Sequence, residues 1–120
     1  MATISKAPLS ASTHGRGIKV TTASPIDGSD TTIHQAVNST TDMDLITLWA
    51  YNSDSVSRVL HLAWGGTTDP DDIEQLEIPP RSGRVLVCHK RILRNNLSIT
   101  ASAAAANVVV VSGEVDQIRA

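Results

Sequence analysis

Residues 45–52 read LITLWAYN, and their side chains alternate between two rows that are both mainly apolar. One row holds Leu45, Thr47, Trp49 and Tyr51, and the other holds Ile46, Leu48 and Ala50. Successive side chains of a β-strand point to opposite faces of the sheet. A strand with two apolar rows is therefore expected at the centre of a sheet or covered on both faces.

Shorter strand-like runs flank this segment, and turn signals such as Gly65-Gly66 and Pro79-Pro80 separate them. The expected strands are Thr31–Val37, Leu45–Asn52, Val56–Trp64, Ile73–Ile78, Arg84–Cys88, Leu97–Ala103 and Asn107–Val115. Runs at spacings of about ten residues are typical of a sandwich or jelly roll. We therefore predict an all-β fold, a single antiparallel β-sandwich of the jelly-roll-like kind over residues 31–120.

The core is expected to be aliphatic, because Phe is absent and the chain has only two Trp and one Tyr. The candidate core residues are Trp49, Leu62, Trp64, Leu86, Val109 and Val111. A small aliphatic core gives modest stability on its own, so oligomerisation is an expected supplement.

Residues 1–30 are rich in Ser, Thr, Gly and Pro and carry only isolated aliphatic residues. Alone, such a segment cannot bury enough apolar area to offset its chain entropy. It is predicted to be either an unstructured tail or, as we prefer, an extended N-terminal arm ordered by contact with a neighbour. The predicted partner-binding residues are the apolar anchors Ile4, Leu9, Ile18 and Val20, with Arg16 and Lys19 as polar contacts.

The net charge of −2 argues against a nucleic-acid-binding protein. Charge is uneven along the chain: residues 42–77 carry eight acidic residues and one Arg, whereas residues 78–120 carry six basic and two acidic residues. These two parts are expected either to pair within one fold or to join neighbouring subunits. The basic stretch 81–94 lacks the aromatic residues that stack on bases, so no nucleic-acid partner is predicted.

No catalytic or metal-binding pattern is recognisable. The four histidines are His14, His34, His61 and His89, and none has the spacing of a zinc site. Cys88 and His89 are adjacent, so on a strand they point to opposite faces and cannot act together. The acidic cluster Asp69, Asp71, Asp72 and Glu74 lacks the glycine and distal glutamate of an EF-hand loop, which favours a solvated loop over a calcium site. The sequence predicts no enzyme, no cofactor and no metal.

The first residues lack the apolar run of a signal peptide, and no apolar stretch approaches the roughly 20 residues that span a bilayer. The chain is expected to be made in the cytoplasm, to remain soluble and to have no membrane partner.

Three pieces of sequence carry a resemblance: LWAYN (residues 48–52), AWGGTT (63–68) and IPPRSG (78–83). Over residues 33–119 the chain resembles small structural proteins from the heads of tailed bacteriophages. The resemblance implies a decoration (cement) protein on the exterior of the virion capsid, produced in the host cytoplasm. It further implies the major capsid protein as partner and a homotrimer of β-sandwiches near threefold positions.

Two alternatives remain open. A head–tail connector or tail component could use a similar sandwich, and would form a ring. A carbohydrate-binding sandwich module would need exposed aromatic rings, and that hypothesis fails if Trp49 and Trp64 are buried.

Overall fold

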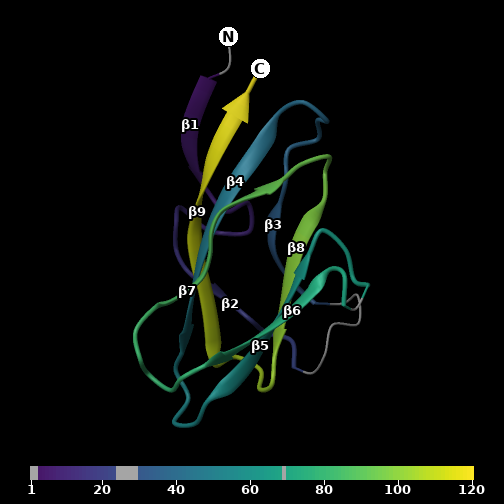
Figure 1. Cartoon of the computed structure of the whole chain (residues 1–120). Coiled ribbons are helices and arrows are strands. Elements are labelled where there is room, and N and C mark those ends of the chain that lie inside the picture. The colour runs from purple at the N-terminus through teal and green to yellow at the C-terminus, as the bar shows by residue number, and fades with distance from the viewer. Residues whose placement is uncertain (1–2, 24–29, 69) are drawn as a thin grey trace.

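A computed structural model describes residues 3–23, 30–68 and 70–120 of the chain. Its strands are β1 (Thr3–Pro8), β2 (Ile18–Lys19), β3 (Thr31–Gln35), β4 (Met43–Asn52), β5 (Arg58–Trp64), β6 (Ile73–Ile78), β7 (Val85–Leu93), β8 (Ser98–Ala103) and β9 (Val109–Arg119). The five-stranded sheet has the order β1-β9-β4-β7, with β2 also paired to β9, and the four-stranded sheet has the order β3-β8-β5-β6 (Figure 1). In the described part of the chain, no helix is long and apolar enough to cross a membrane.

The strand pairs are nested around the β5–β6 connection. β5 pairs with β6, β4 with β7, β3 with β8 and β2 with β9, all of them antiparallel. The chain is thus one long hairpin rolled so that successive pairs alternate between the two sheets: β5–β6 and β3–β8 lie in the four-stranded sheet, and β4–β7 and β2–β9 lie in the five-stranded sheet. This is the arrangement of a double-sheet jelly roll. It confirms the predicted all-β sandwich.

The core between the two sheets is aliphatic. The inward row of β4 is Ile46, Leu48 and Ala50, and each of these side chains is buried. The other fully buried large side chains are Leu9, Val20, Ile33, Leu60, Leu62, Ile78, Ile99, Val109, Val111 and Val115. No aromatic side chain of the described residues is fully buried, so the core depends on Leu, Ile, Val and Ala alone.

The N-terminal segment belongs to the sandwich, whereas the sequence predicts an arm over residues 1–30. β1 pairs with β9 from Thr3 opposite Arg119 to Pro8 opposite Glu114. After β1 the chain inserts Leu9, Ile18 and Val20 into the core cluster. β9 of the same chain therefore orders this segment, whereas contact with a neighbouring molecule was expected to do so. Residues 1–2 and 24–29 of the predicted arm lie outside the described residues.

Two of the predicted core residues, Leu86 and Trp49, do not lie in the core between the sheets. Leu86 is 53% exposed, and its register partner Trp49 is half-buried on the same side of the sheet. Both side chains point away from the four-stranded sheet, because the inward row of β4 is the one that holds Ile46 and Leu48. Leu62, Val109 and Val111 are buried as predicted, and Trp64 is partly buried against the core.

Candidate interaction surface

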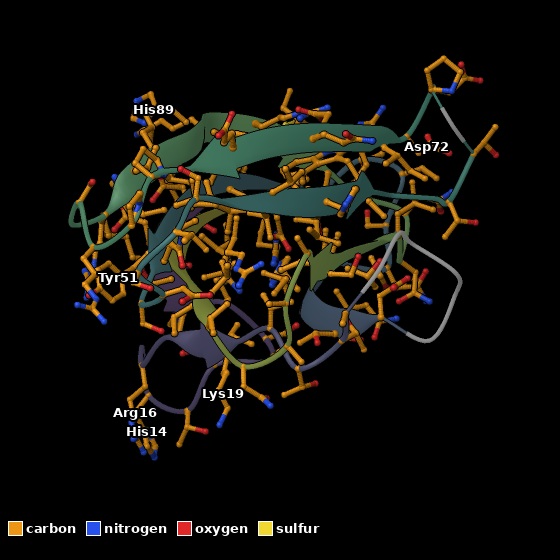
Figure 2. All side chains as sticks on the ribbon, turned by 90° about the horizontal axis from the view of Figure 1, so that it is seen from below. His14, Arg16, Lys19, Tyr51, Asp72 and His89 are labelled. Atoms are coloured by element: carbon orange, nitrogen blue, oxygen red, sulfur yellow. The ribbon has the colours of Figure 1, made fainter. Side chains whose placement is uncertain are left out.

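The outer face is the side of the five-stranded sheet that points away from the four-stranded sheet. The register places Ile4, Ile118 and Met43 side by side across β1, β9 and β4 at one end of this face. The other end carries Trp49 and Tyr51, and Figure 2 shows Tyr51 pointing away from the space between the sheets. The apolar residues of the outer face are Ile4, Met43, Leu45, Trp49, Tyr51, Leu86, Ile92, Val110 and Ile118.

Three of the nine apolar side chains of this face are exposed, and the other six are partly buried. Ile4 is 73% exposed, Ile92 54% and Leu86 53%. Two of the three aromatic residues of the chain, Trp49 and Tyr51, also lie here instead of in the core. Large apolar patches with aromatic residues mark protein–protein contact sites more often than free surface.

A row of charges crosses the middle of the outer face. Lys6 Nζ lies 3.2 Å from Glu114 Oε2 and 3.3 Å from Asp116 Oδ1, and Lys90 Nζ lies 3.0 Å from Asp116 Oδ2. Hydrogen bonds from Lys90 and then Lys6 lower the pKa of Asp116. Hydrogen bonds to Glu114 and then Asp116 raise the pKa of Lys6. The row holds two positive and two negative charges and is therefore balanced.

A β-bulge in β7 puts Lys90 into this row. Leu48 pairs with Cys88 and Ile46 pairs with Arg91, so two residues of β7 stand opposite Thr47. Lys90 has a φ of 52°, and its backbone N–H donates to Thr47 Oγ1 at 3.1 Å. Bulges commonly redirect a side chain, and here the bulge turns Lys90 across β4 towards β9.

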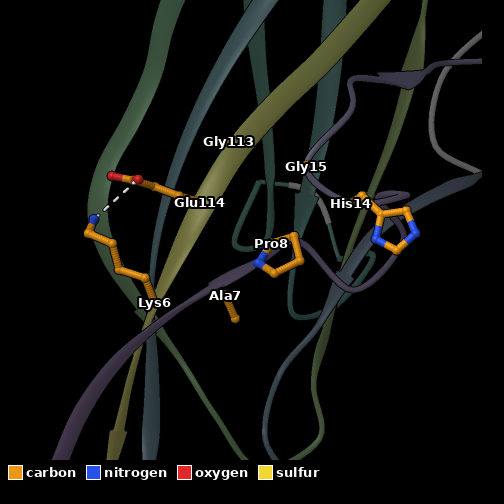
Figure 3. Close-up of a pocket in the computed structure, with 7 residues that line it drawn as sticks. All are labelled: Lys6, Ala7, Pro8, His14, Gly15, Gly113 and Glu114. Carbon is orange, nitrogen blue, oxygen red and sulfur yellow. Dashed lines mark ion pairs between the residues drawn. The ribbon is translucent and has the colours of Figure 1, made fainter.

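Two open depressions adjoin the face. A notch of about 490 Å³ lies where the chain leaves β1, and Figure 3 shows Lys6 paired with Glu114 on one side and His14 on the other. A hollow of about 350 Å³ lies at the aromatic end of the outer face. Its lining residues are Gly17, Tyr51, Gly83, Arg84, Val110 and Ser112.

The predicted partner-binding residues divide into two groups. Leu9, Ile18 and Val20 are buried in the core and have no surface to offer a partner. Ile4 is exposed on β1, at one end of the outer face. Arg16 and Lys19 are also exposed and project on the same side of the molecule as His14 (Figure 2).

Trp64 joins the two sheets at their rim. Its Nε1 donates to the Ile92 carbonyl at 3.3 Å. The guanidinium of Arg91 lies 4.3 Å from the centre of the Trp64 ring and forms an ion pair with Glu74. One ring face is therefore already covered by a cation. The Arg91–Glu74 pair also shows that the acidic and basic parts of the chain pair here within one fold.

A buried histidine–aspartate pair is structural. His34 Nε2 lies 2.9 Å from Asp44 Oδ2, and the Ser10 backbone N–H donates to His34 Nδ1 at 3.0 Å. Because Nδ1 accepts, the proton of a neutral ring belongs on Nε2, where it is donated to Asp44. Both ring nitrogens are thus engaged, and the Ser10 hydroxyl instead accepts from the Gln35 N–H at 2.7 Å. The arrangement lacks the hydroxyl-to-imidazole contact of a hydrolytic triad.

Within the described ranges, no three His, Cys, Asp or Glu side chains come together to hold a metal. Asp69 of the acidic cluster lies outside these ranges, while Asp72 Oδ2 accepts from the backbone N–H of Thr68 at 3.2 Å. Cys88 is half-buried, and burial raises the pKa of its thiol, which makes it a poor nucleophile.

Sequence reasoning missed the outer face as a site. The signal was the second apolar row of residues 45–52, because a strand with two apolar rows is expected to be covered on both faces of its sheet. No known protein family matches this sequence, and no curated protein matches it.

Proposed function

We propose that this protein is a structural subunit of a larger protein assembly. The observation that carries the proposal is the outer face, where nine apolar side chains lie on an uncovered sheet of the described chain. A sheet with two apolar faces gains stability when its second face is covered, at roughly 25 cal/mol for each Å² of apolar surface removed from water.

The specific form we propose is a decoration protein on the exterior of a tailed-phage capsid, with the major capsid protein as partner. This form derives from the sequence resemblance. The jelly-roll fold agrees with it but is shared by many unrelated proteins. Decoration requires broad contact more than a deep pocket, and a solvent-facing sheet with an edge strand such as β1 can add to a neighbour.

The contacts to the shell are assigned to the exposed basic residues of the predicted site, Arg16 and Lys19, because Ile4 lies on the outer face. Arg16 and Lys19 form a basic end that suits an acidic capsid surface. Deleting residues 2–30 is unsuitable as a test, because it also removes Leu9, Ile18 and Val20 from the core. Charge reversal of the two exposed basic residues leaves the core intact.

The experiment uses the purified full chain and DNA-emptied capsids of a phage whose genome encodes it, prepared without the chain. We expect the chain to sediment with the capsids in a fixed ratio. Arg16→Glu combined with Lys19→Glu should lower the occupancy. Arg94→Glu, at an exposed position in the β7–β8 turn, is the matched control. Absence of wild-type binding, or equal binding by all variants, would count against this assignment.

The alternatives give different outcomes. A connector or tail ring would appear as a large cyclic oligomer when the mass is measured in solution. A carbohydrate-binding module would use Trp49 and Tyr51, which are partly exposed on one face, while Trp64 is covered by Arg91. Saturable binding of a glycan that Tyr51→Ala abolishes would favour that function.

A further inference from the structure

We infer that the outer face packs against the outer face of a second copy of this chain, related by a twofold axis. The inference rests on the proposed function only in taking this face to be a protein interface. It names the occupant of the face as the chain itself.

The distribution of residues along the face is self-complementary. Met43 and Tyr51 each stand four residues from Thr47 on β4. Apolar residues occupy both ends and the balanced charges occupy the centre. A twofold axis at Thr47, perpendicular to the strands and parallel to the sheet, places the aliphatic end of one copy over the aromatic end of the other. An isologous interface requires this kind of match between a surface and itself.

The aliphatic and aromatic ends of the outer face also have complementary shapes. Ile4 is the most exposed large apolar residue described, and it projects at the aliphatic end with Ile118 and Met43 beside it. The hollow beside Tyr51 and Val110 lies at the aromatic end. The proposed axis brings the projecting end of each copy to the hollow of the other. Filling that hollow removes apolar surface from water on both copies.

The charges permit the contact. Lys6 and Lys90 balance Glu114 and Asp116 within each copy, so two copies meet without net repulsion. Lysines of one copy can share the carboxylates of the other without losing their own partners, since each ammonium has three donors. A partner with strong net charge of either sign would lack this match.

The area is sufficient for a stable pair. Four strands about 4.8 Å apart and ten residues rising about 3.3 Å each give roughly 600 Å² on each copy. A pair would bury about 1,200 Å², which reaches the range of specific interfaces. Trp49 and Tyr51 near the aromatic end are the residue types that most often dominate such contacts.

The experiment is light scattering on the full chain over a concentration series up to about 100 µM. We expect twice the 12.7 kDa mass of one chain. Leu86→Glu should raise the dissociation constant about 100-fold or more, because a twofold interface contains the substitution twice. Val56→Glu is the matched control, since Val56 is 50% exposed but lies in the β4–β5 turn, away from the outer face. Far-UV circular dichroism verifies that both variants fold.

Cross-linking tests the orientation. In a Cys88→Ser background, Met43→Cys and Tyr51→Cys lie about 26 Å apart on one strand, too far for a short bifunctional thiol reagent. Between copies the axis brings them face to face across about 10 Å. We expect a covalent dimer from the double variant and none from either single variant.

A wild-type trimer or monomer at the highest concentration would overturn the inference, as would a dimer that Leu86→Glu leaves intact. The two proposals are separable. If the chain is monomeric but binds capsids, the inference fails and the proposed function stands. If it is a dimer that binds no capsid, the inference stands and the capsid assignment fails. The trimer implied by the resemblance is the competing outcome.

Discussion

Replacing Arg119, the penultimate residue, is expected to destabilise the protein strongly. Arg119 Nη2 lies 3.0 Å from Asp44 Oδ1, and Asp44 is only 2% exposed. The other carboxylate oxygen is satisfied by His34 and by the Val37 N–H at 3.2 Å. Arg119→Met keeps the packing of the side-chain stem but leaves the buried carboxylate of Asp44 without the Arg119 cation, and leaves Oδ1 with no partner among the described residues.

The magnitude follows from the burial of this pair. Breaking a buried ion pair on one side costs about 3–5 kcal/mol. Arg119 is itself 29% exposed, which gives water some access, so we expect the lower end, about 3 kcal/mol. With a slope of about 1.5 kcal/mol/M, the urea midpoint should fall by about 2 M.

Urea unfolding followed by circular dichroism measures this shift, and a double-mutant cycle isolates its cause. Asp44→Asn removes the charge that Arg119 neutralises. Arg119→Met should therefore lower the free energy of unfolding less in the Asp44→Asn background than in the wild type, by a difference of about 1 kcal/mol or more. Lys6→Met, which removes an exposed cation, should leave the midpoint nearly unchanged. A shift below about 0.3 M for Arg119→Met, or strict additivity in the cycle, would refute the reasoning.

Three further predictions concern single sites. Gly113→Ala should lower the free energy of unfolding by about 1–3 kcal/mol in a thermal melt, because the new Cβ would meet the Thr47 carbonyl oxygen of β4. Cys88 should react slowly with an aromatic disulfide at neutral pH, and denaturant should restore the rate of a free thiol, because burial raises its pKa. Lys90 is the first cause of the lowered pKa of Asp116, so wild type should be more stable than Asp116→Asn above about pH 4. That difference should vanish as the pH falls through the folded-state pKa, and a constant difference in pH-dependent unfolding would contradict it.

The central strands could be predicted from the sequence because their limits carry strong local signals. The run Ile73–Ile78 agrees with β6 in both limits, since Pro79-Pro80 ends it. Leu45–Asn52 also matches β4 apart from two residues at its start. Where turns are marked by Gly or Pro, local sequence is sufficient.

Other features depend on contacts distant in sequence. β1 and β2 carry little apolar surface of their own and form by pairing with β9. The extension of β7 to Leu93 follows a bulge that hides the alternation. Which row of β4 points inward is also undetermined locally, because both rows are apolar and a one-residue slip exchanges them. The sequence shows that β4 has two apolar rows, but it does not show which of them points away from the four-stranded sheet.

The placement of β9 in the sheet has a consequence for how the protein is made. β9 follows the other eight described strands in the sequence, yet it lies between β1 and β4 and pairs with both. β1 and β9 lie side by side in Figure 1 although they are separated by almost the whole length of the described chain. The five-stranded sheet therefore cannot close until β9 has been synthesised, and long-range pairing of this kind is slow. During that interval the edge of β4 that pairs with β9 is open, so the nascent chain passes through a period in which chaperone capture and aggregation compete with folding.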